Sequence, residues 1–111
     1  RPVHDQPGAV LMIQTGEHLV LSFWAEAHFE EEVGPIARGT GVPPVTLAHN
    51  VGTREGVDRV LESARMAGAD PVVEATEREW GGYSGYFADP DGFRWEIACN
   101  PGEVGQLVLP S

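Results

Sequence analysis

The sequence has 111 residues, 41% of them hydrophobic, and a formal net charge of −10. This length suits one domain with a real core. The acidic balance argues against nucleic acid as a partner; it would attract a cationic ligand or simply aid solubility. No apolar run is long enough to span a bilayer, so no membrane partner is expected. A single cysteine, Cys99, excludes a disulfide within the chain and favours a cytoplasmic setting.

The first half of the chain predicts a β-hairpin followed by a short helix. Residues 9–13 and 19–24 are apolar runs typical of strands, and the short connection between them suits a hairpin. Residues 26–33 could form a helix, which the following Gly-Pro pair would end. A stretch rich in glycine and proline, residues 39–44, reads as a linker.

The second half predicts the order strand, helix, strand, strand, strand. Thr53 is a suitable N-cap for a helix running to about Ala67, with apolar side chains recurring at helical spacing along it. An Asp-Pro-Asp-Gly turn at residues 89–92 connects the last two strands, because proline fixes one backbone angle and glycine tolerates the other. The four strands are expected at residues 45–51, 70–75, 83–88 and 93–99.

The two halves look like unequal copies of one unit. The first copy matches the hairpin of the second but has no strand and helix before it, as an internal duplication with a truncated first copy would produce. We therefore divide the chain into a partial first module at residues 1–43, a complete βαβββ module at residues 44–101 and a C-terminal tail at residues 102–111.

Five segments of the second half stand out together: Leu47-Ala48-His49-Asn50-Val51, Val57-Asp58-Arg59-Val60-Leu61, Ala67-Gly68-Ala69, Trp80 to Gly92, and Trp95-Glu96. They resemble the vicinal oxygen chelate superfamily, which includes glyoxalase I, bleomycin-resistance proteins and extradiol dioxygenases. The resemblance covers about half of the chain well and the first hairpin more loosely. The Phe-x-Asp-Pro-Asp-Gly-x-x-Trp-Glu segment is more specific for the fold than for any reaction.

The resemblance implies an α+β fold in which paired βαβββ modules form a half-open cup. By this resemblance the opening strand and helix of the first module should precede Arg1, so they are missing from this chain or supplied by a partner. A homodimer is expected.

Metal-dependent members of this family hold a divalent ion in the cup, and Glu96 stands at the family's metal-carboxylate position. Strand alternation turns Glu96 away from the apolar face that should pack on the helix. The other ligand positions carry Thr46 and either Val20 or Ser22, which do not complete a donor set. His49 has the wrong phase in its strand. We therefore expect no metal and no other cofactor, with a divalent metal as the alternative.

Glu96 is the candidate catalytic residue, because burial beside aromatic side chains would raise its pKa and suit it as a general base. It could instead pair with Arg94 or with a cationic ligand, or serve as a structural carboxylate. An aromatic-walled site is typical of small-molecule pockets, although aromatic residues also fill cores and interfaces. The candidate ligand-binding residues are Trp24, Asn50, Trp80, Tyr86 and Glu96.

Three functions are compatible with these features. The first is a small-molecule-binding protein of the glyoxalase/bleomycin-resistance kind without the family metal, whose ligand is cationic or aromatic. The second is a metal-dependent lyase, isomerase or dioxygenase of the same superfamily. The third is a non-catalytic dimerisation module.

Overall fold

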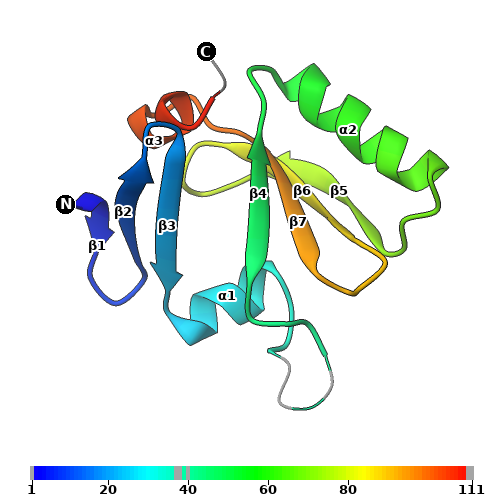
Figure 1. Ribbon diagram of the computed structural model, residues 1–111, viewed down its shortest axis with the longest axis horizontal. Coiled ribbons are helices and arrows are strands. Elements are labelled where there is room, and N and C mark those ends of the chain that lie inside the picture. Colours follow the sequence, from blue (N-terminus) through cyan, green and yellow to red (C-terminus); the bar gives the residue numbers. More distant parts are fainter. Residues whose placement is uncertain (1, 37–38, 40, 110–111) are drawn as a thin grey trace.

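The computed structural model describes residues 2–36, 39 and 41–109 and contains two separate sheets (Figure 1). Residues 1, 37–38, 40 and 110–111 of the predicted first module, linker and tail lie outside the described residues. The first sheet has the order β1-β2-β3 and the second the order β4-β7-β6-β5. The α+β class predicted from the sequence is therefore confirmed. Among the described residues, no helix has both the length and the apolar composition needed to cross a membrane.

The first sheet is antiparallel throughout. It consists of β1 (Pro2–Gln6), β2 (Val10–Gly16) and β3 (Leu19–Trp24). The hairpin of β2 and β3 was predicted, but β1 was not, so the expectation of a hairpin alone was wrong. The polar composition of β1 gives no alternating apolar signal, and its pairing with β2 supplies the backbone hydrogen bonds that hold it.

The second sheet follows the predicted order closely. Its elements are β4 (Thr46–Asn50), α2 (Arg54–Met66), β5 (Val72–Glu77), β6 (Tyr83–Ala88) and β7 (Arg94–Cys99). Strand β4 runs parallel to β7, while β5, β6 and β7 are antiparallel neighbours. The Asp89 side chain organises the turn between β6 and β7, because it accepts hydrogen bonds from the backbone of Asp91 and Phe93 and from the Trp95 indole.

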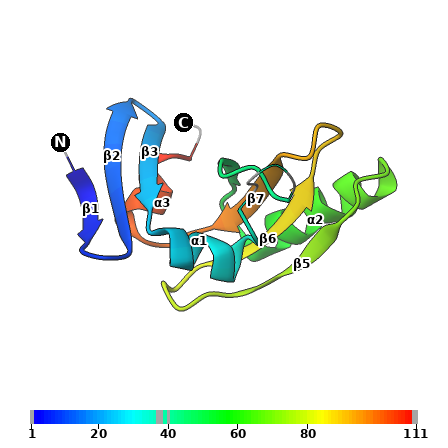
Figure 2. The same cartoon turned by 90° about the horizontal axis from the view of Figure 1, so that it is seen from below.

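Helix α2 begins and packs as its sequence predicts. The Thr53 hydroxyl accepts a hydrogen bond from the Gly56 amide at 3.0 Å, which satisfies one of the free amides of the first turn. Val57 and Leu61 are buried against Ile97 of β7 and form the centre of the core. Figures 1 and 2 show that α2 covers one face of the second sheet and lies away from the first sheet.

Gly85 of β6 lets the helix approach the sheet this closely. A Cβ atom at this position would lie 2.6 Å from Leu61 Cδ1 and 2.6 Å from the Val73 carbonyl oxygen. Glycine is therefore required by space, which the sequence pattern of a strand does not reveal.

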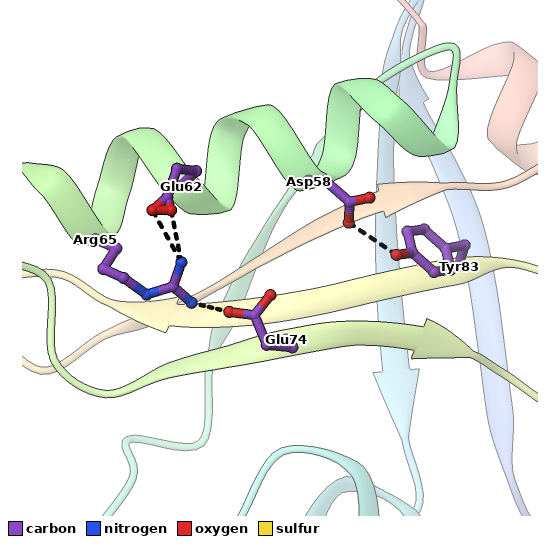
Figure 3. A network of polar contacts seen from close by, with 5 residues as sticks. All are labelled: Asp58, Glu62, Arg65, Glu74 and Tyr83. Atoms are coloured by element: carbon purple, nitrogen blue, oxygen red, sulfur yellow. Dashed lines mark hydrogen bonds and ion pairs between the residues drawn. The ribbon is translucent and has the colours of Figure 1, made fainter.

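Polar contacts around the rim reinforce the same packing (Figure 3). Arg65 of α2 pairs with Glu62 on its own helix at 2.8 Å and also reaches Glu74 of β5. The Tyr83 hydroxyl donates to Asp58 at 2.8 Å. These residues tie the helix to two strands at the surface.

Two short helices join the sheets. Helix α1 (Glu26–Glu32) was predicted and follows β3. Helix α3 (Glu103–Leu107) lies within the stretch assigned to the C-terminal tail, where no helix was predicted. The α3 helix is too short to show a helical repeat. The ring of His18, in the β2–β3 turn, contacts the carbonyl of Leu107 at 3.1 Å.

Candidate functional site

Glu96 and Tyr86 form a buried pair on the face of the second sheet opposite α2. The antiparallel register of β6 and β7 sets Tyr86 directly across from Glu96, so both side chains leave the same face. The Tyr86 hydroxyl lies 3.1 Å from Glu96 Oε2. Tyr86 is 3% exposed and Glu96 is 8% exposed. The structure thus brings together two of the five residues predicted from the sequence.

A second carboxylate, that of Glu32, reaches the same tyrosine from α1. Glu32 Oε2 is in close hydrogen-bonding contact with the Tyr86 hydroxyl. Glu32 is only half-buried. One phenol hydroxyl therefore stands between a glutamate of the sheet and a glutamate of the helix.

Arg78 and Ser84 complete the cluster. The Arg78 guanidinium donates to the Ser84 hydroxyl at 2.9 Å and to the Ser84 carbonyl at 3.0 Å. It also lies over the ring of Tyr86, 5.7 Å from the centroid, within reach of a cation–π attraction. Arg78 follows β5, and Ser84 shares a strand face with Tyr86, so β6 contributes two of the five members.

Burial and charge make this cluster favour bound protons. Burial is the main reason that the pKa of Glu96 rises from its ordinary value near 4.5 to about 7, and the nearby charge of Glu32 raises it further. Hydrogen bonds from Tyr86 and Ser84 and the charge of Arg78 oppose this rise. Burial, followed by the charges of Glu96 and Glu32, also raises the pKa of Tyr86, so the phenol stays protonated.

Trp24, Asn50 and Trp80, the remaining predicted site residues, lie elsewhere. Trp24 packs edge-on against Phe29 of α1, with ring centroids 5.7 Å apart. Asn50 is half-buried at the end of β4, opposite Ala98. Trp80 is exposed in the β5–β6 loop, and its ring lies over Gly82. None of these three has a hydrogen bond to the Glu96 cluster among the contacts of the described residues.

Three members of the cluster were not predicted. Ser84 has the same strand phase as Tyr86, so alternation could have found it. Arg78 lies in a loop and Glu32 lies 54 residues before Tyr86, and no local pattern marks either of them. Arg94, the sequence candidate for a partner of Glu96, donates instead to the Gly92 carbonyl at 3.2 Å.

The β4 position that pairs with Glu96 carries no metal donor. The parallel register places Ala48 beside Glu96, and a methyl group donates no ligand atom. Thr46 lies opposite Arg94, and its hydroxyl donates to the Arg94 carbonyl at 2.8 Å. Within the described part of the chain, no three His, Cys, Asp or Glu side chains gather as a metal site would require.

The cluster lines neither of two hollows found on the surface of the described residues. One, of about 470 Å³, follows the start of α2 and is lined by Thr53, Arg59 and neighbouring residues. The other, of about 270 Å³, lies on the first sheet beside Phe23 and Trp24. The side chains of Tyr86 and Glu96 are instead buried in this conformation.

Solved structures show the same fold. A glyoxalase-related enzyme from Fulvimarina pelagi is 33% identical with a TM-score of 0.54, over 100% of this chain and 81% of its own. An NAD-dependent benzaldehyde dehydrogenase from Legionella pneumophila is 27% identical with a TM-score of 0.64, over 89% of this chain and 77% of its own. A glyoxalase/bleomycin resistance protein/dioxygenase family enzyme from Burkholderia phytofirmans PsJN is 23% identical with a TM-score of 0.50, over 86% and 73% of the two chains.

The comparison with curated proteins finds no match. The comparison with family models matches residues 3–97, which include α1, α2, Glu96 and both sheets except the first residue of β1 and the last two of β7. The chain therefore belongs to the Glyoxalase/Bleomycin resistance protein/Dioxygenase superfamily.

Proposed function

We propose that this protein binds a small organic molecule at the Glu96 face of the second sheet, without a metal ion at the family's position. The observation that carries the proposal is the buried Glu96–Tyr86 pair. A carboxylate in such a place costs folding energy unless it is paired, and the resemblance to the superfamily assigns Glu96 to the metal-carboxylate position. Ala48 beside it supports a role that is free of metal.

A cationic ligand suits this site best. Two carboxylates, those of Glu32 and Glu96, converge on one phenol, and a protonated amine could donate a hydrogen bond to each of them. The net charge of −10 would attract such a ligand from a distance. An aromatic group on the ligand could pack against the ring of Tyr86. Trp24 lies at the end of α1 opposite to Glu32.

Binding is tested by calorimetry with a panel of aromatic amines and their neutral and carboxylate analogues. We expect the amines to bind and the carboxylates not to bind. Glu96→Gln should weaken amine binding at least tenfold, whereas the control Glu17→Gln, in the exposed β2–β3 turn, should leave it unchanged. Equal binding of amines and carboxylates, or an unaffected Glu96→Gln variant, would contradict the proposal.

A second candidate function is proton transfer with Glu96 as general base. The observation that favours it is the pKa of Glu96 near 7, which matches the requirement for a base at neutral pH. Exchange of the α-protons of hydroxyacetone in D₂O, followed by proton NMR, tests it. Wild type should accelerate exchange and Glu96→Gln should not; identical rates with both proteins would leave binding as the function.

We also propose that the protein acts as a homodimer. Leu19, Leu21 and Phe23 form an exposed apolar row on β3, and such rows often mark interfaces. Sedimentation velocity at several protein concentrations is the test, and a monomer at all of them would contradict this assembly.

A further inference from the structure

The contact of Glu32, Tyr86 and Glu96 requires more protons than the phenol alone can supply. The Tyr86 hydroxyl carries one proton, so it can donate to one carboxylate only. The other carboxylate makes a hydrogen bond with the phenol oxygen only if it carries a proton of its own. With both glutamates ionised, one of the two contacts would set a negative oxygen against an oxygen lone pair.

Helix α1 reaches the second sheet through this contact. Glu32 is in its last turn and reaches Tyr86 from outside. At the other sheet, Phe29 of α1 is buried and packs against Trp24. The helix therefore bridges the two sheets, with an apolar contact to the first and a proton-dependent contact to the second.

The other groups around Glu96 indicate which of the two glutamates moves away from Tyr86 when the proton is lost. Charged or titratable groups face it from each neighbouring element that carries one: Glu32 from α1, Tyr86 from β6, and Arg78, which follows β5. Strand β4 contributes Ala48, which does not titrate. Ser84 of β6 and Arg78, the residue directly after β5, favour an ionised Glu96, whereas Glu32 is half-buried on a seven-residue helix. Glu32 is therefore the group that moves away when the extra proton is lost.

We propose that the Glu32–Tyr86–Glu96 contact is a proton-dependent latch, which holds α1 over the Glu96 face and releases it when the shared proton leaves. The closed form is favoured in mild acid and the open form in mild alkali. Because the pKa of Glu96 is raised to about 7, the change falls near neutral pH. Opening exposes Tyr86 and Glu96 without any need for a ligand, so the latch stands or falls separately from the proposed binding function.

Amide hydrogen exchange of α1 tests the latch. Protection is measured by mass spectrometry on peptides covering residues 24–33 between pH 5.5 and 8.5, after correction for the intrinsic exchange rate. Wild type should lose at least fivefold of its α1 protection across this range, while peptides of β6 and β7 change little. Glu32→Gln, which carries a permanently neutral amide, should keep α1 protected throughout.

Glu31→Gln is the matched control, because Glu31 is an exposed neighbour on the same helix. It removes the same charge and should retain the pH dependence of wild type. The proposal is wrong if wild-type protection of α1 does not change with pH, or if Glu31→Gln abolishes the dependence as fully as Glu32→Gln. Because the Glu32 side chain is only half-buried, Glu32→Gln is expected to fold without disturbing the packing of the hydrophobic core.

Discussion

The two sheets of this protein carry similar apolar strands, but among the described residues only the second sheet has a helix packed along its apolar face. On β3 of the first sheet, Leu19, Leu21 and Phe23 are 62%, 50% and 55% exposed. In the second sheet, Ile97 is covered by Val57 and Leu61 of α2 and is 1% exposed. Alternation along a strand thus sets which side chains share a face, while burial depends on what packs against that face.

The largest expected effect comes from shortening a side chain under α2. Leu61→Ala should lower the free energy of unfolding by about 3 kcal/mol, because the loss of buried methyl groups leaves a cavity. Leu21→Ala, the matched change on the first sheet, should alter it by no more than about 0.5 kcal/mol. Urea denaturation followed by circular dichroism measures both, and equal losses would show that the exposed row is buried in solution.

A similar comparison concerns the opposite face of the second sheet. The folded pKa of Glu96 lies above its ordinary value, so ionisation disfavours the folded state. Stability should be full below about pH 4.5 and fall as the pH rises through about 7. The loss should reach at most about 3 kcal/mol, since a tenfold change in proton affinity corresponds to about 1.4 kcal/mol and release of α1 relieves part of it.

Glu96→Gln should remove this loss, whereas Glu17→Gln on the first sheet should keep it. The measurement is urea denaturation at pH 5, 6, 7 and 8. A wild-type stability that rises over this range would contradict the assigned direction of the pKa.

The beginning of α2 gives a smaller effect. Thr53→Ala should cost about 1 kcal/mol, because the Gly56 amide loses its side-chain partner. The first helix provides the comparison, since its N-cap residue, Ala25, makes no side-chain hydrogen bond. Thermal unfolding followed by circular dichroism should show a lower Tm for Thr53→Ala and almost none of this change for Thr15→Ala, a control in β2.

The smallest effect is expected from the rim of α2. Arg65→Ala should cost less than about 1 kcal/mol, because its pairs with Glu62 and Glu74 are exposed to solvent and screened. Raising the salt concentration to about 0.5 M should reduce this cost further. Arg59→Ala on the same helix is the control, and urea denaturation at both salt concentrations is the measurement.

Sequence reasoning reached the elements whose signal is local. Alternation and helical spacing predicted α2 and the four strands of the second sheet, because each has an apolar face of its own. Strand β1 is polar and is held in place by its pairing with β2, so no periodic pattern in the sequence predicts it. Gly85 is needed for space under Leu61, a requirement set by the distance between a helix and a sheet.

The residues of the site also divide into those with a local sequence signal and those without one. Tyr86 and Glu96 could be placed on one face because strand phase fixes the direction of a side chain. Their direct pairing depends on the register of β6 and β7, which the short Asp89–Gly92 turn supplies. Glu32 comes from a helix whose acidic sequence shows no apolar stripe facing the sheet, so only the folded chain brings it to Tyr86.

The parallel pairing of β4 with β7 also bears on the order in which the sheet assembles. Thr46 and Arg94 are partners separated by 48 residues, whereas Tyr86 and Glu96 are separated by 10. Closing a long loop costs more chain entropy than forming a hairpin around a tight turn. We therefore expect the β6–β7 hairpin and α2 to form early and β4 to join last, completing the Glu96 face only at the end of folding.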